Sequence, residues 1–331
     1  MTVRPGATRW GFIGAGYVAT RALAPAVHAA THATLQAVGA RDLARARQLD
    51  PSRAYEGYSA VLDDVDVDIV YVSLSNEAHL EWVVKALHAG KHVVCEKPLT
   101  LSASECATAF AEATSCQRIL VEATWTRWHP RHRRAAQLVA DGAVGGVRAV
   151  DGVFAFDGVP AGNYRLEPDR GGGALLDVGP YLLWPVVDLC DGPATAVECE
   201  AVRLRGGIDL SADATLKGAG WTARLHAAID EPERQELAVT GQALTLTWDS
   251  PAHTNWHERS SLVLDDGTTT WTEYFAPCDA YRLMVDDISR AVMGEHVGPL
   301  PGAAQSVATA ELIDRIAAEL PAVHGASTGP R

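Results

Sequence analysis

The chain has 331 residues, of which 47% are hydrophobic and 21% charged, and its formal net charge is −13 at pH 7. This length accommodates two domains, the composition is that of an ordinary globular enzyme, and the negative charge argues against a nucleic-acid-binding protein. With no signal peptide or membrane-spanning stretch in view, we expect a cytoplasmic protein without nucleic-acid or membrane partners.

Cysteine and histidine spacing predicts no metal centre. The six cysteines, at positions 95, 106, 116, 190, 199 and 278, include no Cys-x-x-Cys pair, so we expect reduced thiols rather than a zinc site or a disulfide framework. His129 and His132 have no further ligands clustered nearby in the sequence, and we therefore predict that they hold no metal.

The first predicted strand runs into a glycine-rich turn and then into a helix. The turn has the pattern Gly-x-Gly-x-x-Ala, in which Gly14 permits the tight turn, Gly16 lets the backbone approach a pyrophosphate and Ala19 lets the helix pack on the strand. Unpaired N–H groups at the helix start favour an anion there. The predicted dinucleotide contacts are Gly14, Gly16, Tyr17, Val18 and Ala19.

Strands and helices alternate through the first third of the chain, which is typical of a parallel sheet covered on both faces. We therefore predict that residues 1–123 form a doubly wound α/β domain of the Rossmann type. The predicted strands are Trp10–Ile13, Leu35–Gly39, Ile69–Leu74, His92–Cys95 and Arg118–Val121, and the predicted helices are Tyr17–Ala29, Leu43–Leu49, Ala78–Ala89 and Ala103–Ala113.

The end of the second strand indicates which dinucleotide is used. An acidic residue at this position usually binds the ribose 2′-hydroxyl of NAD. Here Arg41 comes first and Asp42 stands at a helix N-cap position, so we interpret Arg41 as a partner for the 2′-phosphate of NADP, supported by Arg45. The alternative is an exposed arginine, with Asp42 as the ribose ligand of NAD.

Two further strand ends carry polar side chains, at the edge where ligands bind in doubly wound sheets. After Glu96 comes Lys97, whose direction is set by Pro98 across a bond that can be cis, and we expect burial to lower the ammonium pKa and suit it to proton transfer. The alternative is a surface lysine before a turn. The cofactor contacts predicted at these ends are Leu74, Ser75, Asn76, His79, Glu96 and Lys97, although His79 can equally be structural.

The pattern changes after residue 123. One helix, Pro130–Ala140, and one strand, Val147–Phe156, precede a run of strands between Thr195 and Tyr274. Two helices, Tyr281–Met293 and Ala303–Leu320, follow. We predict that residues 124–331 form a second α/β domain with an open, mainly antiparallel sheet, and that residues 321–331 are a disordered tail.

Three consecutive glycines at positions 171–173 precede a helical segment that contains Asp177 and Tyr181. The i, i+4 spacing predicts that both side chains emerge on one helical face, among leucines and valines. A buried carboxylate and phenol need partners or a ligand. The alternative is a pair that satisfies itself within the core.

Together these motifs resemble the glucose-fructose oxidoreductase / inositol dehydrogenase / MocA (Gfo/Idh/MocA) family, and most clearly its dihydrodiol dehydrogenase and NADP-dependent xylose dehydrogenase branch. The resemblance covers nearly the whole chain and rests on residues 14–19, 41–42, 89–98, 121–130 and 171–181. It implies a Rossmann domain and an α/β domain whose sheet forms a homodimer or homotetramer interface. It also implies Lys97 and Tyr181 as the proton-transfer pair, with Asp177 as a third catalytic residue in the substrate site. Many sugar- and inositol-oxidising relatives carry histidine where Tyr181 stands, which favours the dihydrodiol, xylose or keto-sugar reductase branch over the inositol one. Many relatives have proline where Ser75 stands, and this departure changes little.

The resemblance implies reversible hydride transfer between NADP (or NAD) and a hydroxyl or keto carbon of a sugar or related cyclic polyol. We expect the Lys97 ammonium to lower the pKa of the Tyr181 phenol and to stabilise the developing oxyanion. Arg165 could fork onto vicinal hydroxyls, and Trp125 could stack on a sugar ring or simply belong to the core. The predicted substrate contacts are Trp125, Arg127, Asn163, Tyr164, Arg165, Asp177 and Tyr181.

Two other functions stay open. One is a dinucleotide-binding regulator without turnover, a type that usually loses the catalytic lysine or its partner. The other is a glycoside hydrolase of the same fold, which oxidises and re-reduces its sugar without consuming cofactor.

Overall fold

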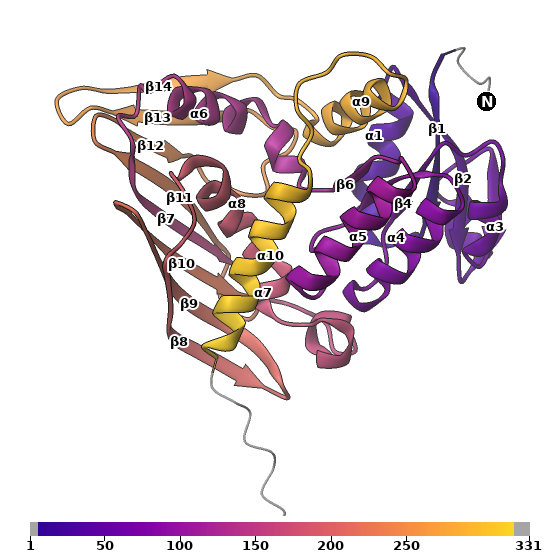
Figure 1. The fold of residues 1–331 in the computed structure, drawn as a ribbon, viewed down its shortest axis with the longest axis horizontal. Helices are drawn as coiled ribbons and strands as arrows, with labels where there is room; N and C mark the ends of the chain where they lie inside the picture. The colour runs from indigo at the N-terminus through magenta and orange to yellow at the C-terminus, as the bar shows by residue number, and fades with distance from the viewer. Residues whose placement is uncertain (1–5, 321–331) are drawn as a thin grey trace, which may run out of the picture.

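The computed structural model describes residues 6–320, which build two sheets that lie side by side with helices between them (Figure 1). The first sheet has six strands in the order β3-β2-β1-β4-β5-β6, all paired in parallel. The second has eight strands in the order β14-β13-β12-β11-β7-β10-β9-β8, in which the β7–β10 pair is parallel and the other pairs are antiparallel. Both predicted sheet types are confirmed.

The first sheet follows the predicted alternation of strand and helix. Residues 17–29 are helical throughout, with a π turn, η1 (Ala19–Leu23), continuing into α1 (Ala24–Ala29). The other elements are β1 (Thr8–Ile13), β2 (Ala33–Ala40), α2 (Leu43–Arg47), β3 (Arg53–Glu56), α3 (Ser59–Asp63), β4 (Ile69–Val72), η2 (Asn76–Ala78), α4 (His79–His88), β5 (His92–Cys95), α5 (Ala103–Ser115) and β6 (Leu120–Glu122).

The rest of the chain builds the second sheet and the helices on its inner face. The helices and 3-10 turns are η3 (Trp125–Trp128), α6 (Pro130–Ala140), η4 (Tyr164–Leu166), η5 (Pro168–Arg170), α7 (Ala174–Asp177), α8 (Gly179–Leu189), α9 (Ala280–Val292) and α10 (Ala303–Ala318). The strands are β7 (Val147–Ala155), β8 (Ala196–Arg205), β9 (Ile208–Gly218), β10 (Trp221–Ala228), β11 (Arg234–Gly241), β12 (Thr245–Trp248), β13 (Ser260–Asp265) and β14 (Thr270–Phe275).

Two features of the secondary structure differ from the prediction. The strand β3 and helix α3 were not predicted, because Arg53–Glu56 is a short, polar edge strand without an apolar run. The helix expected to carry both Asp177 and Tyr181 is broken at Val178, which ends α7 before Pro180 stands in the first turn of α8. A proline in a first turn starts a new helix because it has no N–H to donate to the preceding turn.

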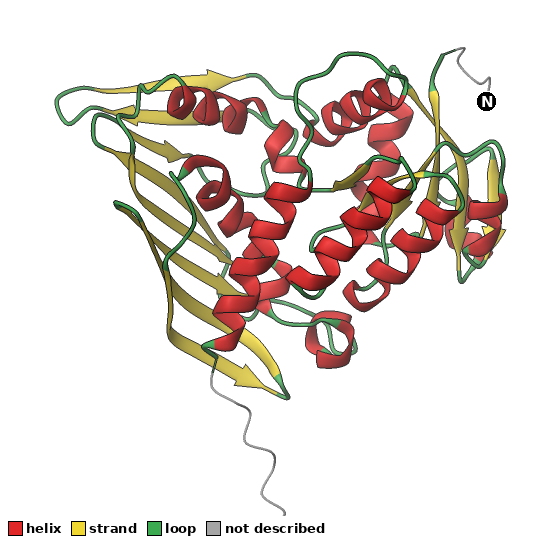
Figure 2. Cartoon of the chain, viewed as in Figure 1, coloured by secondary structure: helices red, strands yellow, loops and turns green. Residues whose placement is uncertain are grey.

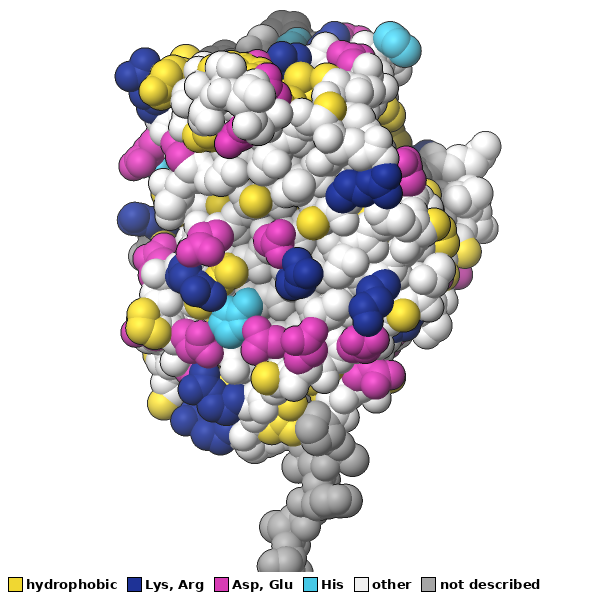
Figure 3. All heavy atoms as spheres, turned by 90° about the vertical axis from the view of Figure 1, so that its left-hand side faces the viewer, with side chains coloured by type: hydrophobic (Ala, Val, Ile, Leu, Met, Phe, Trp, Pro, Cys, Tyr) yellow, Lys and Arg dark blue, Asp and Glu magenta, His cyan; other side chains and the backbone are white. Residues whose placement is uncertain are grey.

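Among the described residues, helices cover only the inner face of the second sheet (Figure 2). Strand residues alternate accordingly, as in β11, where Leu237 and Val239 are buried while Glu236 is exposed. Charged side chains of both signs are scattered among uncharged ones on the outer face (Figure 3). Cross-strand ion pairs such as Lys217–Glu198 contribute to this pattern.

Helix α9 comes late in the chain but packs on the first sheet. Its Tyr281, Met284 and Ile288 belong to the same buried cluster as Trp10 and Phe12 of β1. Helix α10 lies between α5 and α8, and so contacts both halves (Figure 1).

A domain boundary after residue 123 stays our proposal, although α9 returns across it to the first sheet. The predicted disordered tail, residues 321–331, lies outside the described residues. Within residues 6–320, no helix is long and apolar enough to cross a membrane.

Candidate active site

The ends of three parallel strands bring the predicted motifs to one edge of the first sheet. Ile13, Val72 and Cys95 are register partners across β1, β4 and β5. The glycine turn, the loop after β4 and the segment that begins with Glu96 therefore leave the sheet side by side. Ligands of doubly wound sheets bind at this carboxyl edge.

Lys97 joins this edge to the second half of the molecule. It follows β5 directly, and its bond to Pro98 is cis. Its ammonium donates to the Asp177 backbone carbonyl at 2.5 Å and to Asp177 Oδ1 at 3.1 Å, and it lies 5.1 Å from the centre of the Tyr181 ring. Segments 80 or more residues apart thus bring together the three residues predicted to be catalytic.

Asp177 is a buried carboxylate shared by two cations. Its Oδ2 accepts a hydrogen bond from Arg165 Nε at 2.6 Å, while Oδ1 faces Lys97. Although burial by itself raises the pKa of Asp177, the two cations lower it to about 2. The carboxylate is therefore ionised at neutral pH, and the Lys97–Asp177–Arg165 group carries one net positive charge.

The protonation states of Lys97 and Tyr181 differ from the expectation. Burial lowers the pKa of Lys97, but the adjacent Asp177 carboxylate outweighs burial and raises this pKa above its usual value. Burial also raises the pKa of Tyr181, against the opposing effect of the Lys97 ammonium. The prediction of a lowered Lys97 pKa is wrong, because it ignored the ion pair with Asp177. The ammonium does lower the pKa of the Tyr181 phenol, as expected, but burial of the phenol outweighs this effect. Both groups hold their protons at neutral pH.

Trp125 contacts the phenol instead of offering a free ring face. Its indole Nε1 donates to Tyr181 Oη at 3.2 Å. Its ring stacks on Tyr281 at 5.1 Å between centroids, and only 3% of the residue is exposed. A Trp125 side chain in this position orients the hydroxyl of Tyr181 but has no open face for a sugar ring.

The other predicted substrate contacts divide into two groups. The guanidinium carbon of Arg165 lies 4.8 Å from the centre of the Tyr164 ring, and the same guanidinium pairs with Asp177. Arg165 and Tyr164 therefore belong to the cluster around Lys97, Asp177 and Tyr181. Arg127 forms a two-pronged pair with Asp188 at 2.7 and 3.0 Å. Asn163 accepts from the Arg165 backbone N–H at 3.0 Å and caps the short turn η4. Arg127 therefore has its partner outside the cluster, whereas Asn163 supports the backbone of Arg165 within it, and the substrate roles of both stay predictions.

Asp209, which the sequence analysis missed, supports the helix that carries Asp177. Its Oδ2 accepts from the Leu175 backbone N–H at 2.6 Å, at the start of α7. A Cβ at Gly173, where φ is +114°, would lie 2.1 Å from Asp209 Oδ1, so this position requires glycine. In the sequence, the only indication of this role is an acidic residue between the apolar residues Ile208 and Leu210. Burial raises the pKa of Asp209 to about 6.

The glycine turn fits the backbone of a dinucleotide. Gly14 has φ of +102°, and a Cβ there would lie 2.2 Å from the Ser73 carbonyl, so this turn requires glycine. At Gly16 the nearest atom to such a Cβ would be 3.7 Å away, which leaves the helix start open for a ligand. Tyr17 is 79% exposed beside it, followed by Val18 and then Ala19, which is buried.

The residues at the end of β2 partly follow the prediction. Arg41 is exposed, and Asp42 caps α2 by accepting from the Ala44 N–H at 2.8 Å. Arg45 donates to the Ala15 carbonyl at 2.6 Å and so braces the glycine turn. Because Asp42 is occupied as an N-cap, Arg41 is the freer of the two side chains to meet a 2′-phosphate.

The polar residues after β4 and β5 mainly hold the two halves together. Asn76, which is 3% exposed, donates to the Gly171 carbonyl at 2.8 Å, and Ser75 Oγ contacts Glu77 and Arg170. Glu96 accepts from the Tyr71 hydroxyl at 2.6 Å.

His79 is wholly buried and lies between two loops of the site. Its Nδ1 is 2.8 Å from the Pro98 carbonyl and its Nε2 is 3.3 Å from the Leu74 carbonyl. Burial lowers the pKa of His79, so the neutral imidazole has one N–H to donate. These contacts tie the Lys97–Pro98 segment to the loop after β4, and cofactor contacts by these residues stay predictions.

A parallel sheet with this glycine turn, next to a Lys–Asp–Tyr cluster, defines the class of dinucleotide-dependent oxidoreductases. Residues 8–124 match the family model for the oxidoreductase family with an NAD-binding Rossmann fold, GFO_IDH_MocA, and residues 132–247 match the GFO/IDH/MocA C-terminal domain. The chain belongs to the Gfo/Idh/MocA family of oxidoreductases, and the resemblance drawn from its motifs is confirmed.

Named relatives include both enzyme types of the expected branch. The chain is 34% identical over 317 residues to D-xylose 1-dehydrogenase (NADP(+)) 2 of Haloferax volcanii, covering 93% of this chain and 95% of the relative. It is 34% identical over 227 residues to trans-1,2-dihydrobenzene-1,2-diol dehydrogenase of Danio rerio, covering 65% and 66%. The structure of KijD10, a 3-ketoreductase from Actinomadura kijaniata in complex with NADP and TDP-benzene, matches with a TM-score of 0.84 and 28% identity, covering 95% of this chain and 98% of that one.

Proposed function

We propose that this protein is an NADP-dependent oxidoreductase that interconverts a hydroxyl and a keto group on a sugar or a related cyclic polyol. The observation that carries the proposal is the convergence of Lys97, Asp177 and Tyr181 beside the sheet edge from which the glycine turn emerges. The names of the xylose dehydrogenase and ketoreductase relatives support this substrate class.

The residues present fit an NADP molecule at this edge. Gly14 and Gly16 would admit the pyrophosphate, the N–H groups at the start of the first helix would face it, and exposed Arg41 would meet the 2′-phosphate. Relatives that bind or use NADP support this choice over NAD. When bound, the nicotinamide accepts or supplies the hydride.

The chain's own groups manage the proton. Tyr181 holds its proton at neutral pH and its oxygen already accepts from Trp125, so its O–H is free to donate to a developing alkoxide. The Lys97 ammonium, fixed by Asp177, stabilises negative charge on the phenol or the substrate oxygen. Both groups rest in their acid forms, which is the protonation state that reduction of the keto group requires, and oxidation requires the phenol to release its proton first.

The test is a substrate screen in which turnover is measured by the absorbance of the reduced nicotinamide. Pentoses, hexoses, dihydrodiols and keto-sugars are offered with NADP(H) and NAD(H) in both directions. We expect stoichiometric oxidation or reduction of NADP(H) with at least one sugar-like substrate. Dinucleotide binding without turnover across the screen would favour the regulator, and product formation from a glycoside without net change in absorbance would favour the hydrolase.

We also propose a homodimer or homotetramer formed through the outer face of the second sheet. No helix within residues 6–320 covers this face, and it presents charges of both signs, which a second copy could match (Figures 2 and 3). Sedimentation of the purified protein would report the mass, and a monomer at micromolar concentration would contradict the proposal.

We propose a reducing, cytoplasmic location. All six cysteines are free, which supports this proposal.

A further inference from the structure

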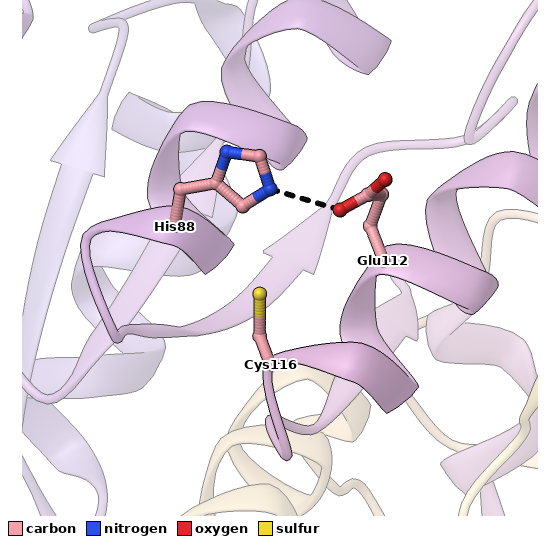
Figure 4. Close-up of side chains that lie close together, drawn as sticks. All are labelled: His88, Glu112 and Cys116. Carbon is pink, nitrogen blue, oxygen red and sulfur yellow. Dashed lines mark hydrogen bonds and ion pairs between the residues drawn. The ribbon is translucent and has the colours of Figure 1, made fainter.

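Three side chains with metal-binding atoms meet on the surface of the first half, away from the Lys97 cluster. They are His88 at the end of α4, and Glu112 and Cys116 on and just after the last turns of α5 (Figure 4). One ligand atom from each lies within 4.8 Å of the other two, and this is the only such group of three within the described residues 6–320. His88 Nε2 and Glu112 Oε2 are 2.8 Å apart.

The backbone holds these side chains in place without a ligand. Glu112 and Cys116 are four residues apart on α5, so both point to one side of the helix. Helix α4 packs beside α5 and brings His88 to them. Arg118 Nε donates to the Gly90 carbonyl at 2.6 Å and links the segments that follow the two helices.

Two helices end beside this group. Helix α4 ends at His88, and Cys116 is the C-cap of α5, so the C-terminal ends of two helices point toward the group. Each end carries a partial negative charge. The carbonyls of both last turns accept backbone N–H groups, and the Arg118 guanidinium donates to the Gly90 and Gln117 carbonyls that follow them. These two ends are a feature of the fold that is independent of the identity of the three side chains.

The donor set suits zinc or a similar borderline cation. Imidazole nitrogen, thiolate sulfur and carboxylate oxygen are the ligands of zinc sites in proteins, and ligand atoms around a tetrahedral ion lie roughly 3.5 Å apart. Small rotations of the three side chains would bring their ligand atoms from their present spacing to the spacing around a tetrahedral ion. Glu112 and a Cys116 thiolate together balance the charge of a divalent ion, and the exposed position leaves water as a fourth ligand.

We propose that His88, Glu112 and Cys116 form a surface site for a divalent cation of the zinc type, which cross-links the ends of α4 and α5. The alternative is an ordinary imidazole–carboxylate ion pair with a thiol nearby. On binding, the Cys116 thiol proton is released to solvent, and the proton that His88 Nε2 shares with Glu112 moves to Nδ1 of the neutral ring, which frees Nε2 and the carboxylate for the metal. The site lies outside the proposed active site, so its test does not depend on the proposed reaction.

Cobalt(II) is the first probe, because its bond to a thiolate gives an intense near-ultraviolet charge-transfer band. Tag-free protein, reduced and freed of metal, is titrated with Co²⁺. We expect the band to saturate at one ion per chain and to disappear on addition of Zn²⁺. The Cys116→Ser variant should lose the band, and His88→Ala and Glu112→Gln should each require at least about tenfold more Co²⁺.

Matched controls keep the test specific to this group. Cys278→Ser removes another partly buried thiol, and His32→Ala removes another imidazole–carboxylate pair, with Asp286; both should keep the band. In a second measurement, Zn²⁺ should raise the thermal midpoint of the parent but not of Cys116→Ser. Absence of a thiolate band in the parent, or a band that survives in Cys116→Ser, would overturn the proposal.

Discussion

At the scale of single residues, Lys97 is the group on which the proposed chemistry depends most. Removing its ammonium by Lys97→Ala should lower kcat by about 10²- to 10⁴-fold, because a positioned proton donor and its charge are lost. Cofactor affinity should stay nearly unchanged, since the glycine turn and Arg41, which we expect to hold the phosphates, are left intact. Arg165 still compensates the Asp177 carboxylate. Steady-state kinetics and NADPH binding by fluorescence check both effects, with Lys85→Ala on exposed α4 as control. Activity within about tenfold of the parent would rule out this role.

Trp125 offers a second residue-level test. Trp125→Phe keeps an aromatic ring against Tyr281 but removes the N–H that donates to Tyr181 and lowers the pKa of its phenol. We expect kcat to fall by about tenfold and the alkaline limb of its pH profile to move upward. In a Tyr181→Phe background the change should add almost nothing. Equal losses in both backgrounds would indicate a packing role instead, and Trp271→Phe on exposed β14 serves as control.

Sequence motifs identified the residues of the cluster but not their protonation states. Lys97, Asp177 and Tyr181 stand in recognisable motifs, so their convergence could be predicted. The pKa directions could not, because they depend on burial and on an ion pair between positions 80 residues apart. Likewise, nothing in the surrounding sequence shows that Trp125 donates to a phenol rather than stacking on a ligand.

At the scale of elements, the short helix α7 depends on a carboxylate from the second sheet. Folded Asp209 has a pKa of about 6, above the value near 3.9 of an unfolded aspartate, so the folded chain binds this proton more tightly. That stabilisation is present at low pH and is lost as the pH rises through about 6. We therefore expect the contribution of Asp209 to the free energy of unfolding to fall by about 1.4 kcal/mol when the pH is raised from about 5 to about 7.5.

Asp209→Asn removes this titration while keeping an acceptor for the Leu175 N–H. Urea unfolding of parent and variant at both pH values isolates the contribution, because the other titrating groups cancel in the difference. We expect the variant to gain stability relative to the parent at the higher pH. A difference that does not change with pH would show that Asp209 does not titrate in this range.

Elements with strong apolar periodicity were predicted to within a few residues, and those without it were not. The helices at 130–140 and 103–115 show clear patterns and caps. Strand β3 and helix α3 are short and carry no such pattern, so only their neighbours in the sheet define them. The break between α7 and α8 has a local signal in Pro180, which stands in the first turn of α8, whereas the contacts that Asp209 and Lys97 make with α7 come from distant segments and have none.

At the scale of the whole molecule, the outer face of the second sheet is the surface through which we expect copies to associate. Ala238 lies on that face in β11, one of the two central strands, and its neighbours Leu237 and Val239 point into the core. Ala238→Arg should reduce the sedimenting mass to that of one chain, because a long charged side chain would separate the two sheets. Val65→Arg, on an 83% exposed position of the first half, should leave the mass unchanged.

The return of α9 to the first sheet makes the two halves interdependent. A fragment that stopped at residue 123 would uncover Trp10, Phe12 and their apolar neighbours, which Met284 and Ile288 now shield. Its product should be insoluble unless the distal piece is supplied together with it. Recombination between genes could therefore transfer this Rossmann unit only together with the last third of its gene. The two sheets look like separate modules, but they are not inherited independently.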